Sequence, residues 1–131
     1  MCIFCKIANK EIPSTCLYED EKVMAFLDLS QVTKGHTLVI PKQHYANLLE
    51  CDDDTLAHVM QVSKKLAKHI MEKTGASGVN FLSNTNEVAG QSVMHFHVHI
   101  IPRYGEDDAF VLKFNESQPQ DLEALGAELK L

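Results

Sequence analysis

The chain has 131 residues, 45% of them apolar, and a formal net charge of −6. This length and apolar share predict one domain over residues 1–131 with its own core, which excludes disordered and collagen-like proteins. The longest basic run is Lys64-Lys65, so we expect no binding of duplex nucleic acid and no basic membrane-binding surface. No apolar stretch approaches the roughly 18 to 20 residues of a membrane span, and residues 1–6 lack an export-signal pattern. The cytoplasm is therefore the expected compartment.

Hydrophobic periodicity predicts five strands and one long helix. The helix has apolar residues at steps of three and four, acidic residues at its start and Gly75 beyond its end. We expect an α+β fold with a mainly antiparallel five-stranded sheet, the long helix and short terminal helices. In chain order, the predicted segments are a helical turn at 4–9, strands at 15–18, 23–27 and 36–40, the helix at 53–73, strands at 79–83 and 94–101, and a helix at 121–129. Residues 105–131 form a more polar tail.

Three alternating histidines are the most informative pattern. On a strand, His95, His97 and His99 point to one face, while the apolar residues between them point to the other. A single three-histidine metal site is an alternative, but residues four apart on a strand lie about 13 Å apart, so one ion does not easily reach all three. We therefore expect the histidines to divide between two roles. Neutral imidazole is also a plausible nucleophile for phosphorus.

Several motifs together resemble one protein family. The segment His95-Phe-His-Val-His-Ile-Ile is similar to the signature of the histidine triad (HIT) proteins, which are nucleotidyl hydrolases and transferases. Four further segments resemble family motifs in the same order: Cys2-Ile-Phe-Cys-Lys-Ile, Ala25-Phe-Leu-Asp-Leu, Gly35-His-Thr-Leu-Val-Ile-Pro-Lys and Gly90-Gln-Ser. The chain departs from the pattern at Gln31, where the family often has proline. The resemblance covers about residues 1–104.

The resemblance implies a HIT-like fold and a nucleotide whose α-phosphate lies over the histidine strand. His97 would be the nucleophile that forms a nucleotidyl-histidine intermediate. Asp28 would bind the ribose hydroxyls, for which a carboxylate is chemically suited. The other implied site residues are His99, Ser92, Gln91, Asn84 and His36 near the phosphate, and Phe26, Leu27 and Leu29 around the base.

A metal site is the second expectation. Cys2 and Cys5 have metal-ligand spacing, which alone is a weak signal, and His95 is left over once the other two histidines are assigned to phosphate. With His44 these residues would make a closed tetrahedral zinc site, and some bacterial HIT proteins resemble this arrangement. Zinc there would be structural. The alternative is that both cysteines are free thiols packed in the core.

The leading functional hypothesis is a HIT-type nucleotide hydrolase acting on purine nucleoside phosphoramidates or dinucleoside polyphosphates. The alternative is a zinc-bearing nucleotide-binding or interaction module with little turnover. The presence of His97, Ser92 and His99 disfavours that alternative, since a binder needs no nucleophile. The resemblance also implies a homodimer.

Overall fold

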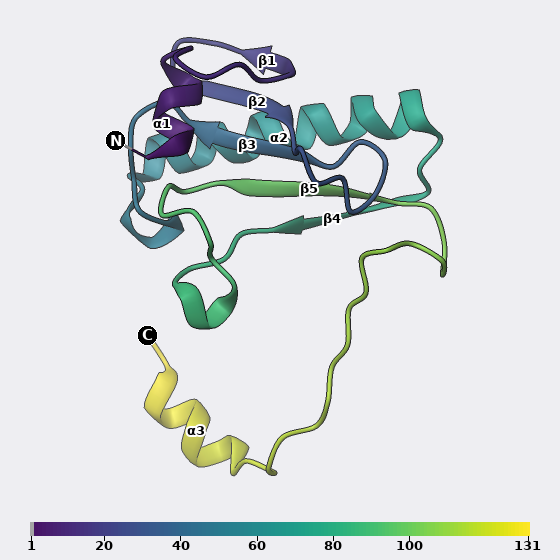
Figure 1. Ribbon diagram of the computed structural model, residues 1–131. Coiled ribbons are helices and arrows are strands. Elements are labelled where there is room, and N and C mark those ends of the chain that lie inside the picture. The colour runs from purple at the N-terminus through teal and green to yellow at the C-terminus, as the bar shows by residue number, and fades with distance from the viewer. Residues whose placement is uncertain (1) are drawn as a thin grey trace.

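The computed structural model describes residues 2–131, and its centre is one five-stranded sheet (Figure 1). Every strand pairing in it is antiparallel. The order across the sheet is β1-β2-β3-β5-β4. The strands are β1 (Cys16–Glu19), β2 (Val23–Leu27), β3 (Thr37–Pro41), β4 (Gly78–Leu82) and β5 (Val98–Arg103). The predicted α+β fold with a mainly antiparallel sheet is confirmed.

The long helix α2 (Asp53–Thr74) covers one face of the sheet, and the short helix α1 (Ile3–Ala8) lies against the other (Figure 1). The backbone N–H of Thr55 donates to the Asp52 side chain at 2.6 Å, which caps the start of α2. Gly75 ends it with a φ of 76°, a conformation that favours glycine. These caps explain why the predicted helix bounds and the observed ones agree so closely.

Alternating residues of the central strands fill two separate cores. Val23 and Ala25 face α2, whereas Met24 and Phe26 pack with α1. In β5, Val98 also belongs to the α2 core, so its neighbours in the strand project toward the α1 side. The central strands β2 and β3 are thus buried on both faces, and the histidine face looks toward α1.

The strand carrying the histidines is shorter and later than expected. The sequence predicts a strand at 94–101, but β5 begins at Val98 and continues through Pro102 to Arg103. The ladder to β3 ends at the pair Val39 and Val98, and the N–H of Phe96 donates instead to the Tyr45 carbonyl at 2.7 Å. His95 and His97 therefore lie in an irregular segment before the strand. The alternating pattern is present, but the pairing that would continue the strand is not.

The turn between β1 and β2 is tied to α2 through Asp20. Its carboxylate accepts hydrogen bonds from the Tyr18 hydroxyl at 2.8 Å and from His58 Nε2 of α2 at 2.6 Å. The backbone N–H groups of Lys22 and Val23 also donate to it. This hydrogen-bonded cluster fixes the first hairpin on the helix.

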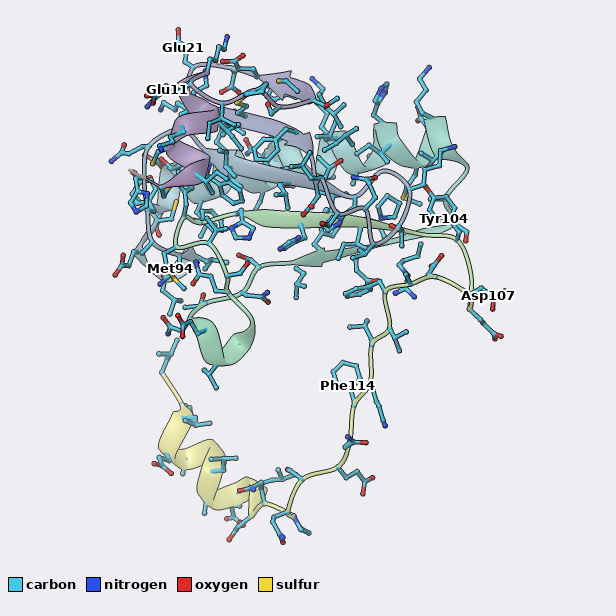
Figure 2. The ribbon with its side chains drawn as sticks, viewed as in Figure 1. Glu11, Glu21, Met94, Tyr104, Asp107 and Phe114 are labelled. Atoms are coloured by element: carbon cyan, nitrogen blue, oxygen red, sulfur yellow. The ribbon has the colours of Figure 1, made fainter. Side chains whose placement is uncertain are left out.

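After β5 the chain leaves the sheet. Residues 111–124 are exposed, and helix α3 (Leu122–Leu129) lies apart from the strands (Figure 1). Phe114, 90% exposed, projects from the extended part of this tail (Figure 2). Two short 3-10 turns, η1 (Leu48–Glu50) and η2 (Glu87–Ala89), complete the secondary structure described. Among residues 2–131 no helix has both the length and the apolar character needed to cross a membrane.

Candidate functional site

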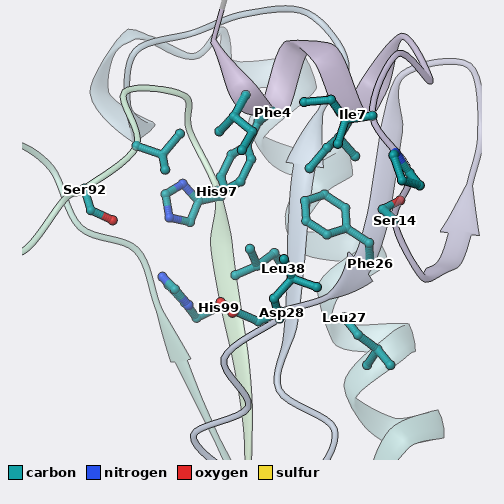
Figure 3. A pocket seen from close by; sticks show the side chains of 15 residues that line it. Phe4, Ile7, Ser14, Phe26, Leu27, Asp28, Leu38, Ser92, His97 and His99 are labelled. Carbon is teal, nitrogen blue, oxygen red and sulfur yellow. The ribbon is translucent and has the colours of Figure 1, made fainter.

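A pocket of about 270 Å³ opens between α1, the end of β2 and the histidine segment (Figure 3). Four chemically active side chains line it together: Asp28, Ser92, His97 and His99. The sequence predicts all four as site residues. The predicted base-wall residues Phe26, Leu27 and Leu29 also line this pocket. The structure therefore brings most of the predicted site into one cavity.

His97 is held in a defined orientation inside this pocket. Its ring is buried, 6% exposed, and Nδ1 lies 2.7 Å from the carbonyl oxygen of His95. Because a carbonyl only accepts, Nδ1 carries the hydrogen and Nε2 keeps its lone pair in the neutral ring. Burial lowers the pKa of His97 below its ordinary value. The side chain is thus neutral near pH 7, with one nitrogen available for nucleophilic attack.

His99 is linked to a fourth histidine. Its Nδ1 lies 2.9 Å from Nε2 of His36, which is buried beneath it. Burial, and the neighbouring His97 and His36, lower the pKa of His99 to about 4. Since Nδ1 is occupied by His36, Nε2 is the His99 nitrogen that remains available to a ligand.

Asp28 follows β2 and lies at the edge of the pocket, near this histidine pair. One carboxylate oxygen, Oδ1, accepts from the Ser30 N–H at 2.7 Å, while Oδ2 lies 3.7 Å from His36 Nε2. The ligand atoms of Asp28, His36 and His99 lie within 4.8 Å of one another, although the two histidines already satisfy each other by a direct hydrogen bond. Oδ2 therefore has acceptor capacity left for a ligand.

Gln31 explains how the loop after Asp28 keeps its shape without proline. Its side-chain Nε2 donates to the carbonyls of Asp28 at 2.6 Å and His36 at 2.7 Å, and its Oε1 accepts from the Gly35 N–H at 2.8 Å. Three hydrogen bonds thus hold the loop between β2 and β3. The loop geometry that proline would supply elsewhere is supplied here by a side chain.

Three residues predicted near the phosphate do not line the pocket: His36 lies beneath His99, and Gln91 and Asn84 lie in the loop before the histidines. Gln91 is buried, 3% exposed, with Nε2 donating to the carbonyls of Ala46 and Val93 and Oε1 accepting from the Asn86 N–H. Its amide bonds three backbone groups and shapes the loop before the histidines, while its contact with phosphate stays a prediction. Asn84 bonds the Gly90 carbonyl at 3.2 Å. Gly90 has a φ of 100°, so the same loop also requires glycine there.

Sequence reasoning missed one wall of the pocket. Helix α1 contributes Ile3, Phe4 and Ile7, and the segment after it contributes three further residues. With Leu38 and Val93, six residues from this part of the chain line the cavity: Ile3, Phe4, Ile7, Ile12, Pro13 and Ser14. The apolar spacing of residues 3–7 is compatible with a helix packed on a core, but it contains no signal that the helix faces a ligand.

The predicted metal ligands meet on the other side of α1. Cys2, Cys5, His44 and His95 place two sulfur atoms and two Nδ1 atoms at six mutual separations between 3.2 and 3.5 Å. Zinc bonds of about 2.3 Å to sulfur and 2.0 to 2.1 Å to nitrogen imply edges of roughly 3.3 to 3.8 Å in a tetrahedron. The four donor atoms therefore form a compact tetrahedral cluster that fits one metal ion.

Each ligand of this cluster has a clear structural origin. Cys2 caps α1, with its sulfur accepting from the Cys5 N–H at 3.2 Å, and His44 comes from the loop after β3. His95 is completely buried, and its Nε2 lies 2.8 Å from the Pro41 carbonyl, so this nitrogen donates and Nδ1 is left as a free lone pair. The donor chemistry and the tautomer both suit a cation, since unprotonated nitrogen and thiolate are its ligands.

Comparisons with known proteins match this geometry to one group. A family model described as the HIT domain matches residues 9–106. The chain is 47% identical over 132 residues to "Protein hit" of Bacillus subtilis, covering 98% of this chain and 91% of that protein. It is 38% identical over 130 residues to adenosine 5′-monophosphoramidase hnt1 of Schizosaccharomyces pombe, covering 98% and 95%. A crystal structure of a HIT family protein from Bacillus anthracis has a TM-score of 0.91 and 44% identity, covering 98% and 94%.

Proposed function

The chain belongs to the HIT family, and from this premise we propose that it is a nucleotide hydrolase that works through a covalent nucleotidyl-histidine intermediate. The observation that carries the proposal is the geometry of His97 in the pocket, with Nδ1 bonded to the His95 carbonyl at 2.7 Å and a lowered pKa. A neutral, oriented imidazole is the form that attacks phosphorus. The substrates we propose are nucleoside 5′-phosphate derivatives, either purine nucleoside phosphoramidates or dinucleoside polyphosphates. The similarity to a yeast protein named a monophosphoramidase supports this class.

The proposed reaction has two displacement steps at the α-phosphorus. In the first, the lone pair of His97 Nε2 forms a bond to phosphorus, and the bond from phosphorus to the leaving group breaks. The leaving group departs with that electron pair and takes a proton from water, relayed by the Ser92 hydroxyl. In the second, water attacks phosphorus, and the bond from phosphorus to His97 breaks with its electron pair returning to Nε2. The proton lost by this water neutralises the hydroxide left by the first step, and the nucleoside 5′-monophosphate is released.

We propose that His99 contacts a phosphoryl oxygen and that His36 orients it from beneath. His36 Nδ1 lies 3.4 Å from the Val32 nitrogen and 3.3 Å from the Ser30 carbonyl oxygen, so moving the His36 hydrogen between Nδ1 and Nε2 would reverse its hydrogen bond to His99. We propose the state with the His36 hydrogen on Nε2, because His99 then carries its own hydrogen on Nε2, where it can donate to a phosphoryl oxygen. A neutral donor in this position suits the low pKa of His99. We also propose that Asn84, in the loop before the histidines, contacts the phosphate.

Ribose and base would occupy the rest of the pocket. We propose that Asp28 Oδ2 accepts from the ribose hydroxyls, because Oδ1 is already bonded to Ser30. The base would lie between apolar walls from β2 and α1, with Phe26 and Ile7 among them. Such walls bind a purine by its faces and distinguish one purine from another weakly.

We further propose that the cysteine and histidine cluster holds a structural zinc ion. Zinc would supply closed tetrahedral coordination that ties the start of α1 to the sheet, and it takes no part in the displacement steps. The six donor separations and the Pro41 carbonyl behind His95 support this proposal. All four cysteines are free, consistent with a reducing compartment, and we propose the cytoplasm.

We propose that the chain forms a homodimer. Residues 105–131 are the least packed part of the chain. Six large apolar side chains of this tail are exposed, and we propose that a partner covers them: Val111, Leu112, Phe114, Leu122, Leu129 and Leu131. Light scattering of the full chain would give twice the mass of one chain. A monomer at micromolar concentration would contradict this assignment.

The test of the reaction is the replacement of His97. His97→Ala should abolish hydrolysis of adenosine 5′-phosphoramidate while AMP still binds, because the pocket walls remain. His69→Ala is the matched control, since His69 is an exposed histidine of α2, and it should retain full turnover. With substrate labelled at the α-phosphate, quenched unmutated enzyme should carry acid-labile label. AMP binding by the unmutated protein without turnover or label would instead indicate a nucleotide-binding module.

A further inference from the structure

Phe4 lies where the metal cluster and the nucleotide pocket meet. In sequence it stands between the two thiol ligands Cys2 and Cys5, in the first turn of α1. In space its ring packs edge-on against His95, with centroids 6.0 Å apart, and against His97, with centroids 5.0 Å apart. One buried ring thus touches a metal ligand and the proposed nucleophile.

The same ring also forms part of the pocket wall. Phe4 lines the cavity beside His97 and packs edge-on against Phe26 of β2 at 5.7 Å (Figure 3). On its other side, the His97 ring contacts His99, with centroids 5.0 Å apart. The nucleophile therefore sits between two rings. The position of His99 is held by its strand in the sheet, whereas the position of the Phe4 ring depends on that of helix α1.

Helix α1 is too short to be stable by itself. It has six residues, and helices of this length need tertiary contacts to form in water. Its contacts are a small apolar core and the two sulfur atoms in the cluster. A metal ion bound by Cys2 and Cys5 would fix the first turn of the helix, which is the turn that carries Phe4.

We propose that Phe4 is a positioning residue that couples metal binding to nucleotide binding. Metal binding holds the first turn of α1, this turn holds the Phe4 ring, and the ring fixes both the pocket wall and the orientation of His97. The inference rests on the proposed nucleotide site and adds to it a coupling between two ligands. Coupling between binding sites is reciprocal, so a nucleotide must strengthen metal binding by the same factor as the metal strengthens nucleotide binding.

The experiment measures this coupling factor by binding alone. The dissociation constant of AMP is measured by calorimetry on zinc-loaded and chelator-treated protein, and the dissociation constant of zinc is measured by competition with a chelating dye, with and without AMP. For the unmutated chain we expect zinc to tighten AMP binding about tenfold and AMP to tighten zinc binding by the same factor. Phe4→Leu keeps an apolar side chain of similar size but removes the ring. It should bind one zinc ion and still bind AMP, with a coupling factor near one.

Ile3→Ala is the matched control. Ile3 lines the same pocket from the same helix, but it is half exposed and has no ring to set against His97. This variant should weaken AMP binding equally in both forms and keep the coupling factor of the unmutated chain. The zinc competition starts from folded, loaded protein, so it gives an answer even if calorimetry on the zinc-free chain fails.

Two results would overturn the coupling and leave the proposed function standing. One is strong AMP binding that does not change the dissociation constant of zinc, and the other is a Phe4→Leu variant with undiminished coupling. Failure of the zinc-loaded, unmutated chain to bind AMP at all would overturn the nucleotide site and this inference with it.

Discussion

Asp28→Asn tests which group reads the sugar of the nucleotide. The substitution keeps the shape of the side chain and the acceptor Oδ1 that bonds Ser30 at 2.7 Å, so the loop should stay folded. It replaces Oδ2, the proposed acceptor for the ribose hydroxyls, with an NH₂ group that only donates. A hydrogen bond to a charged group contributes about 1.5 to 3 kcal/mol. Because the Asp28 side chain is 22% exposed, we expect the lower end, equivalent to about tenfold in kcat/KM.

The assay compares adenosine and 2′-deoxyadenosine 5′-phosphoramidates. The unmutated enzyme should prefer the ribonucleotide by about tenfold, whereas Asp28→Asn should treat the two nearly alike. Burial already lowers the pKa of His97, and the Asp28 charge opposes that shift. Losing the charge therefore keeps the nucleophile neutral, so the deoxy substrate should react at a nearly unchanged rate. The reasoning is refuted if the unmutated enzyme does not prefer ribose, or if the variant keeps the full preference. Asp107→Asn, at an exposed carboxylate, is the control.

Three further predictions concern the groups around the site. Cys5→Ser should lower the bound zinc, measured by elemental analysis, and lower the melting temperature, whereas Cys16→Ser at an exposed thiol outside the cluster should change neither. Burial alone would raise the pKa of Asp20, but its hydrogen bonds, including that from His58, hold this pKa well below its usual value. Asp20→Asn should therefore lower the free energy of unfolding above about pH 4, where the unfolded carboxyl is ionised. The difference in this free energy from the unmutated chain should shrink as the pH falls toward the folded pKa. A constant difference from pH 7 to pH 2 would contradict this. Gln91→Leu should cost about 1 to 3 kcal/mol in urea unfolding because three backbone groups lose their partner, and an unchanged midpoint would show that the loop does not need them.

The sequence predicted those elements whose start, periodicity and end all lie within one continuous segment. Helix α2 carries its periodicity, its acidic first turn and Gly75 within one continuous segment, so its ends were predictable. The start of β5 was not. His95-Phe96-His97 alternates like a strand, but whether it pairs depends on β3, more than fifty residues earlier, and β3 ends its ladder at Val39.

The division of the histidines into two roles followed from strand geometry and the family resemblance, but its physical cause is tertiary. His95 turns toward the cysteines because the Pro41 carbonyl accepts from its far nitrogen. Similarly, a resemblance by motif suggested that Gln91 contacts phosphate, yet its environment of three backbone groups could be known only from the folded loop. The contribution of Phe4 to the pocket has the same explanation, since its contact with His97 joins residues 93 positions apart in the chain.

The order of strands in the sheet also has a consequence for biosynthesis. The last strand made by the ribosome, β5, lies between β3 and β4, so both must leave a pairing edge open until residue 103 has emerged. Until then β3, all of whose residues are buried in the folded chain, presents an unpaired backbone edge, which is a known route to aggregation of incomplete chains. Folding of this sheet is therefore completed only after synthesis of the strand that carries His99, and a nascent chain that ends before β5 should need a chaperone.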